Sequence, residues 1–172
     1  MAELTRKQIE EIVTEAGGGE LNLACLDLSG LDLKGLNLRG ANFTSSNLQG
    51  VNLEGGDLSV NPQLQTPTIG VRADLTGAKL QGANLSGAQL QGAHLRDADL
   101  CNACLDNANL STEGQDHVDL RGARLRGASL RGANLSSADL READLTGAEL
   151  DGASLFRAKI DGTVGLKSQD ND

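Results

Sequence analysis

Few residues in this chain have side chains suited to catalysis or metal binding, and their spacing argues against both. Cys101 and Cys104 form a CxxC pair, a spacing found in zinc and redox sites. A structural zinc site needs four ligands, but Cys25 is remote in the sequence, and His94 and His117 lack ligand spacing. We therefore predict no metal site and no cofactor.

The acidic residues likewise point to no reaction. Asp and Glu number 24 against 15 Lys and Arg, yet the sequence contains no Ser-His-Asp order and no phosphate-binding P-loop. The sequence therefore predicts a protein that is not an enzyme. The net charge of −9 favours solubility and disfavours non-specific binding to nucleic acid.

Composition also bears on where the protein works. No apolar run approaches the roughly 18 residues of a membrane span. The opening MAELTRKQIEEIV is charged and lacks the apolar core of a signal peptide. Three cysteines without a secretion signal indicate reduced thiols. We expect a cytoplasmic protein without membrane contact.

The elements that must position the outward side chains follow a five-residue repeat, as in ANLSGAQLQGAHLRDADL. Leucine, replaced once by Phe43 and once by Ile160, recurs every five residues from 23 to 58, 75 to 110 and 120 to 160. These runs hold 8, 8 and 9 repeats, 25 in all. With no Trp or Tyr, this regular set must replace an aromatic-rich core.

Neither an ordinary helix nor a flat strand buries such a set. On an α-helix five residues advance about 140° net, so the leucines would spiral around the axis. On a flat strand, an odd period sends successive leucines to opposite faces. The chain must therefore turn once per repeat, with each leucine, and the alanine two residues before it, directed inward. The remaining polar and glycine positions face outward and suit turns.

The run ADLTGAKLQGANLSGAQLQG resembles the pentapeptide-repeat family, whose consensus is A-(D/N)-L-x-x, and the resemblance covers residues 21–162. It implies an all-β solenoid, a right-handed quadrilateral β-helix with four repeats per coil and about six coils.

Residues 1–20 depart from the repeat and predict a capping α-helix followed by a linker. Thr5 and Gln8 have the spacing of a capping box, and Gly17 marks the end of the helix. The first coil has leucine at its small positions, which indicates that it lies beneath a lid. The apolar face of the predicted helix consists of Ile9, Ile12, Val13 and Ala16.

Two interruptions and a tail complete the organisation. Residues 61–72 hold both prolines and predict a loop. Residues 113–117 keep the phase of the repeat, so they form either a degenerate repeat or a bulging loop. Two loops would leave the rod from the same corner, two coils apart. Residues 163–172 form a polar C-terminal tail.

Charge stacking helps to decide between a repeat and a loop at residues 113–117. A loop stacks residues 25 apart and places Arg124 between Asp99 and Asp144, with alternating sign. A repeat instead stacks Asp99, Asp119 and Asp139 in one column of like charge, which destabilises neighbouring strands. We therefore favour the loop.

The same register creates a candidate protein-binding patch. Arg96, Arg121 and Arg141 stack in one column, and Arg124 and Arg126 lie on the next face. In one interpretation neighbouring aspartates and solvent neutralise these arginines. In the other they dock an acidic segment of a partner protein. Nucleic acid is disfavoured because no aromatic stacking platform accompanies the patch.

Phe156 is the one aromatic residue at an outward position. It either packs under the tail TVGLKSQDND or serves as a candidate interface aromatic, since aromatic residues are enriched at interfaces.

Residues 4–43 resemble the repeat domain of a subgroup in which a BTB/POZ domain of the potassium-channel-tetramerisation type precedes the repeats. That resemblance implies a partner- or substrate-recruiting domain of a cullin-3 ubiquitin ligase adaptor, and the plant member of the group implies a formin-type actin regulator as partner. No BTB domain is present in this sequence, and we expect the domain alone to be monomeric.

Two other functions stay open. The chain fits a stand-alone bacterial or cyanobacterial pentapeptide-repeat protein with a regulatory binding role. Its charge of −9 also fits a DNA mimic that inhibits gyrase, although the polar tail and the leucine centres differ from such mimics.

Overall fold

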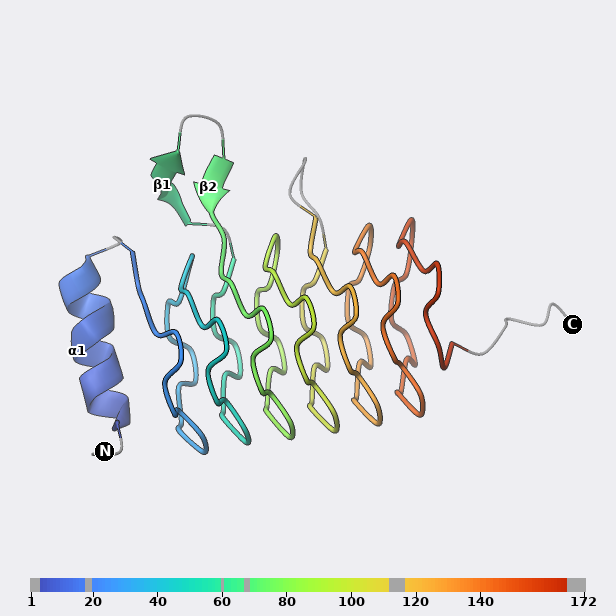
Figure 1. The fold of residues 1–172 in the computed structure, drawn as a ribbon, viewed down its shortest axis with the longest axis horizontal. Coiled ribbons are helices and arrows are strands. Elements are labelled where there is room, and N and C mark those ends of the chain that lie inside the picture. The colour runs from blue at the N-terminus through green and yellow to red at the C-terminus, as the bar shows by residue number, and fades with distance from the viewer. Residues whose placement is uncertain (1–3, 18–19, 60, 67–68, 112–116, 167–172) are drawn as a thin grey trace, which may run out of the picture.

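The computed structural model describes residues 4–17, 20–59, 61–66, 69–111 and 117–166. Figure 1 shows a rod of stacked coils with helix α1 (Arg6–Ala16) across one end and the chain termini at opposite ends. Strands β1 (Asn61–Thr66) and β2 (Ile69–Val71) form an antiparallel hairpin that projects from the side of the rod.

Parallel bridges between residues 20 apart define the coil. Since the bridges recur every five residues, four repeats complete one coil, and the outward residue before each leucine stacks on its equivalent in the next coil. This register is that of the predicted four-sided solenoid. The first four bridges mark its four sides: Asn22 to Asn42, Asp27 to Asn47, Asp32 to Asn52 and Asn37 to Asp57.

One repeat shows why each residue type is needed. The side-chain oxygen of Asn84 accepts a hydrogen bond from the backbone N–H of Ser86 at 3.1 Å, which closes a local turn. Leu85 is fully buried, and the N–H of Ala88 donates to its carbonyl at 3.0 Å. Gly87 occupies the corner at φ +65°, where a residue with a Cβ is strained. The chain thereby turns once in five residues.

Leucine and alanine make up most of the buried interior of the rod. The centres from Leu23 to Leu145, including Phe43, are at most 1% exposed. The alanines at the small positions between Ala73 and Ala143 are buried to the same degree. The inward direction predicted for both positions is therefore confirmed, and the chemistry of the molecule is confined to its outer surface.

Helix α1 begins and ends as its sequence predicts. Thr5 and Gln8 form the reciprocal capping box, and Gly17 ends the helix in the left-handed region at φ +54°. Ile9 is fully buried. Further apolar contacts with the core come from Leu4, Ile12, Val13 and Ala16.

Arg6 seals the edge of the first coil. Its Nη1 donates to the carbonyl of Asp32 at 2.9 Å and its Nη2 to the carbonyl of Lys34 at 3.2 Å. In later coils the carbonyls at these positions accept hydrogen bonds from backbone N–H groups of the preceding coil. The first coil has no such predecessor, so the guanidinium of Arg6 satisfies two groups that would otherwise form an open sheet edge.

The bridge register identifies both interruptions as insertions. Asn42 pairs with Asp74, 32 residues on, whereas Asp99 pairs with Arg124, 25 residues on. The flanks have the 25-residue register that the loop interpretation of 113–117 predicts, whereas residues 112–116 themselves lie outside the described residues. The insertions follow Ser59 and Ser111, which occupy equivalent positions on the same side, two coils apart.

The first insertion differs from the prediction of a loop, because its backbone pairs as the hairpin β1–β2. The apolar residues Leu64, Ile69 and Val71 give a weak strand signal, and Pro62 lowers it further because proline cannot donate to a sheet ladder.

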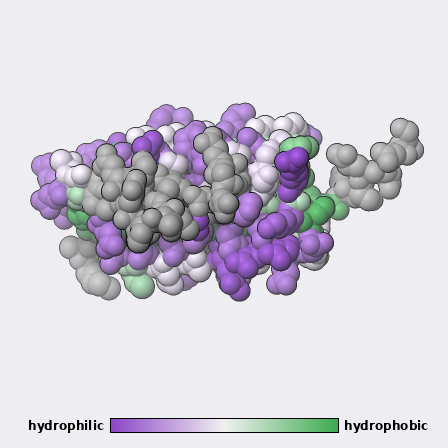
Figure 2. Space-filling view, turned by 90° about the horizontal axis from the view of Figure 1, so that it is seen from above, coloured by the Kyte–Doolittle hydropathy of each residue, from purple (hydrophilic) through white to green (hydrophobic). Residues whose placement is uncertain are grey.

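The C-terminal end exposes apolar side chains. Phe156, Ile160 and Val164 are 66%, 48% and 53% exposed, and Figure 2 shows hydrophobic residues at this end of an otherwise mainly hydrophilic surface. Phe156 points outward as predicted and carries the guanidinium of Arg157 5.0 Å from its ring centre. Most of the tail beneath which it was predicted to pack, residues 167–172, lies outside the described residues.

Among the described residues, no helix has the length and apolar character needed to span a bilayer.

Inward and outward positions should differ sharply in their effect on stability. Leu130→Ala removes a fully buried side chain and should lower the free energy of unfolding by about 2–5 kcal/mol. Gln49→Ala changes an exposed side chain and should cost less than about 0.5 kcal/mol. Urea unfolding checks this, and equal losses for the two variants would contradict the inward–outward assignment.

Candidate functional site: an outer layer of arginines

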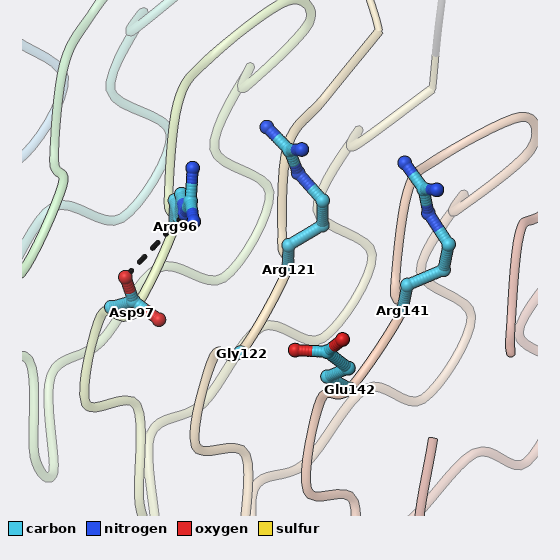
Figure 3. A pocket seen from close by; sticks show the side chains of 6 residues that line it. All are labelled: Arg96, Asp97, Arg121, Gly122, Arg141 and Glu142. Atoms are coloured by element: carbon cyan, nitrogen blue, oxygen red, sulfur yellow. Dashed lines mark ion pairs between the residues drawn. The ribbon is translucent and has the colours of Figure 1, made fainter. Parts of the chain in front are cut away.

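Five arginines gather on two adjacent sides of the rod; we call them the arginine surface: Arg96, Arg121, Arg124, Arg126 and Arg141. Arg96, Arg121 and Arg141 each lie two residues after one bridge column, that of His94, Asp119 and Asp139. Figure 3 shows these three residues on successive coils, with the side chains of Arg121 and Arg141 oriented alike and Arg96 paired with Asp97, 3.5 Å from its Nε. The other two lie on the next side of the rod.

Two of the arginines are held by an aspartate of their own turn. Nε and Nη2 of Arg121 donate to the two carboxylate oxygens of Asp119 at 2.8 and 2.6 Å. Arg141 binds Asp139 in the same way at 2.8 and 2.7 Å. In both cases the arginine's backbone N–H donates to the same carboxylate. Each carboxylate thereby fixes both ends of its arginine, and the two guanidiniums are oriented alike.

The arginines on the next side join successive coils. Nη1 of Arg124 lies 2.8 Å from the carboxylate of Asp99 in the preceding coil. Nε of Arg126 lies 3.7 Å from the carboxylate of Asp144 in the following coil. Arg124 is also bridged through its backbone to Asp99 and Asp144, the alternating column predicted for the loop register.

Burial separates the two signs of charge into layers. The carboxylates of Asp99, Asp119, Asp139 and Asp144 are only 9–28% exposed, whereas their arginine partners are 40–60% exposed. The guanidiniums therefore lie outside the carboxylates that pair with them. An approaching molecule therefore meets the guanidinium of each of these four neutral pairs before its carboxylate. Arg96 is the exception, because it is 55% exposed beside Asp97, which is 64% exposed.

The inner carboxylates are stabilised in their charged form. The side-chain hydrogen bonds from Arg141 lower the pKa of Asp139, against a smaller opposing effect of burial. For Asp119 and Asp99 burial is the largest single effect and raises the pKa. The combined hydrogen bonds and charges around Arg121, and around Cys101, Gln81 and Arg124, nevertheless bring the two pKa values below their ordinary value.

A hollow of about 160 Å³ lies beside the arginine column. Asp97 and Glu142 stand at its two ends, and Gly122 between them contributes no side chain. Gly122 has φ +66°, a conformation that favours glycine, and a Cβ there would require the carboxylate of Asp97 to move. The hollow is lined by Arg96, Asp97, Arg121, Gly122, Arg141 and Glu142.

The cysteines form no recognisable reactive site. All three are free thiols, and burial, followed by the hydrogen bond with Asp99, raises the pKa of Cys101, which makes its thiolate less available. Within the described residues, no cluster of three or more His, Cys, Asp or Glu side chains is placed to hold a metal ion.

Comparison with known proteins agrees with the coil geometry. The family model of pentapeptide repeats matches residues 22–59, 71–111 and 117–163. The chain belongs to the pentapeptide-repeat family. Solved structures of that family imply a right-handed quadrilateral β-helix for the rod. A search of curated protein sequences finds no match.

Two solved pentapeptide-repeat proteins are similar in sequence. HetL, which is involved in heterocyst differentiation regulation in the cyanobacterium Nostoc sp. strain PCC 7120, is 36% identical with a TM-score of 0.56. The match covers 84% of this chain and 65% of HetL, so the chain spans less than two thirds of that relative. A thylakoid-lumen protein of Arabidopsis thaliana is 32% identical over 71% of this chain and 70% of its own, with a TM-score of 0.44.

A more distant solved structure is a trypsin-treated form of QnrB1, a plasmid-mediated fluoroquinolone resistance protein. It is 24% identical over 84% of this chain and 73% of its own, with a TM-score of 0.48.

Sequence reasoning placed the five arginines and set Arg124 beside Asp99 and Asp144, but it missed the partners of Arg121 and Arg141. It did not anticipate that Asp119 and Asp139 bind the arginine two residues later, nor that Asp97 and Glu142 flank a hollow. The D-L-R triplets at 119–121 and 139–141 carry the signal, because the two outward side chains that flank one inward leucine lie on the same side of the rod.

Protonation of Asp139 should weaken the fold. A carboxylate whose pKa is lowered on folding contributes stability above its unfolded pKa, near 3.9, and loses that contribution as the pH falls below it. Asp139→Asn should therefore lower the free energy of unfolding by about 1 kcal/mol at pH 7, and by progressively less below about pH 4.

Urea unfolding over a pH series measures this difference. Asp151→Asn is the control, because the Asp151 side chain is 90% exposed and its contact with Nε of Arg131 is long, at 3.9 Å. An Asp139→Asn effect that does not change with pH would contradict a role for the charged carboxylate.

Proposed function

We propose that the chain is a non-enzymatic regulatory protein that binds another protein through its arginine surface. The observation that carries the proposal is the layering of charge: four exposed guanidiniums lie over less exposed carboxylates on a protein whose net charge is −9. Rigid, outward cations on an otherwise acidic rod favour one face for an acidic partner and repel such a partner elsewhere.

The filled interior supports a role in binding rather than catalysis. Buried apolar side chains, mostly leucine and alanine, line the axis, and the hollow beside Arg121 is small and open to solvent at the surface. Small-molecule sites are generally larger, about 300–1,000 Å³, and mainly apolar. Similarity to HetL over 84% of this chain favours a regulatory role of the kind attributed to that protein.

The other roles predicted from the sequence have less support. No comparison reported above points to a BTB-linked ligase adaptor or to a formin partner. A gyrase-directed DNA mimic needs an acidic surface, whereas an outer layer of arginines covers two sides of the C-terminal half of this rod.

Loss of the arginine column should abolish partner binding. The full chain, its Arg121→Gln/Arg141→Gln variant and an Arg131→Gln control are immobilised and exposed to a lysate of the organism that carries the chain. Arg131 is a matched control because it lies on another side of the same coil, is 54% exposed and also pairs with acidic residues. Retained proteins are identified by mass spectrometry, and circular dichroism checks the fold.

We expect at least one protein to be retained by the wild type and the Arg131→Gln control and lost by the double variant. Retention that is equal for all three chains would contradict a role for the arginine surface.

A further inference from the structure

We infer that the arginine column recognises an acidic α-helix of the partner, laid along the axis of the rod, rather than an extended segment. This inference rests on the proposed function and adds the conformation and charge pattern of the partner. It follows from the spacing of the three arginines, the fixed orientation of Arg121 and Arg141, and the hollow beside them.

The spacing of the column matches a helix. Arg96, Arg121 and Arg141 stand on successive bridged coils. With neighbouring strands about 4.8 Å apart, the second and third arginines lie about 4.8 and 9.6 Å along the axis from the first. Residues i, i+3 and i+7 share one face of an α-helix and lie at about 0, 4.5 and 10.5 Å along it. Measured along the axis, the positions of three carboxylates on such a helix therefore differ from those of the three arginines by no more than about 1 Å.

An extended partner loses this match. Alternate side chains on one face of a strand are about 6.7 Å apart, so the third lies about 13.4 Å from the first. That is nearly 4 Å beyond the third arginine, by the same strand spacing. At most two acidic side chains of an extended segment therefore meet the column at one time.

The side chains of Arg121 and Arg141 are already oriented for binding such a partner. Nε and Nη2 of Arg121 and of Arg141 are occupied by their own aspartates, and Nη1 of each guanidinium makes none of the hydrogen bonds found among the described residues. Each therefore offers an outward donor whose direction is already set. Fixing these side chains before binding reduces the conformational entropy lost in the complex.

The hollow specifies a second feature of the helix. Asp97 and Glu142 stand on either side of Gly122, parallel to the arginine column. On the partner helix, a basic side chain at position i+4 lies beside the face formed by i, i+3 and i+7, about 6 Å along the helix axis from residue i. It would reach the hollow over Gly122 between the two carboxylates. The expected partner helix thus carries glutamate or aspartate at i, i+3 and i+7 and lysine or arginine at i+4.

Two alanine-rich peptides of about 20 residues test the inference, because shorter helices are marginal in water. The first carries Glu at i, i+3 and i+7 with Lys at i+4. The second has the same composition, with its Glu residues at i, i+2 and i+4. Titration of the ¹⁵N-labelled full chain at low salt is followed through backbone amide signals and the Nε–H signals of the arginines.

We expect the first peptide to bind about tenfold more tightly than the second, the advantage of aligning a further exposed ion pair and the basic residue. Its binding should be lost in Arg121→Gln/Arg141→Gln, retained in Arg131→Gln and weakened by raising the salt concentration. The Nε–H signals of Arg121 and Arg141 should shift together.

Equal affinity for the two peptides, binding that survives in the double variant, or no binding of the first peptide would each overturn the inference. The lysate experiment separates this failure from failure of the proposed function. If the double variant loses a protein that the wild type retains while the peptides fail, the surface binds a partner of another conformation. If neither experiment shows dependence on Arg121 and Arg141, both proposals fail.

Discussion

The structure depends on one constraint: a leucine must reach a common axis once in every five residues. Five residues provide one residue that pairs with the next coil and one turn at the corner, so the chain turns at each repeat. Four such repeats complete a coil. The same constraint places every outward residue directly over its equivalent in the next coil. Outward side chains consequently form columns, and a substitution in one coil acts on the coils above and below it.

Columns make the placement of charge critical. The backbones of Asp119 and Asp139 are bridged directly, so their two negative charges repel each other. The charge of Asp139 accordingly acts to raise the pKa of Asp119. The structure offsets this repulsion by giving each aspartate its own arginine two residues later. Because the short aspartates stay near the backbone and the long arginines extend past them, the arrangement that relieves the repulsion also creates an outer positive layer.

Much of the fold follows from the period of the sequence, because period and residue size act on the backbone. The inward alanines, the capping box of α1 and the 25-residue register across the second insertion were predictable in this way, whereas the coil of four repeats was implied by the family resemblance. The pairing of Arg141 with Asp139 and the hollow at Gly122 were not, because they depend on side-chain rotamers on an exposed surface. The hairpin β1–β2 also escaped prediction, since Pro62 obscured its weak strand pattern.

The central claim is that inner carboxylates hold Arg121 and Arg141 rigid on the surface, and ¹⁵N relaxation of the arginine Nε–H groups tests it most directly. Order parameters for these two side chains should approach the value of about 0.85 found for rigid backbone. Arg157, which stacks on the exposed ring of Phe156 and has no carboxylate partner among the described residues, should be clearly more mobile. Order parameters below about 0.6 for Arg121 and Arg141, equal to that of Arg157, would contradict the account.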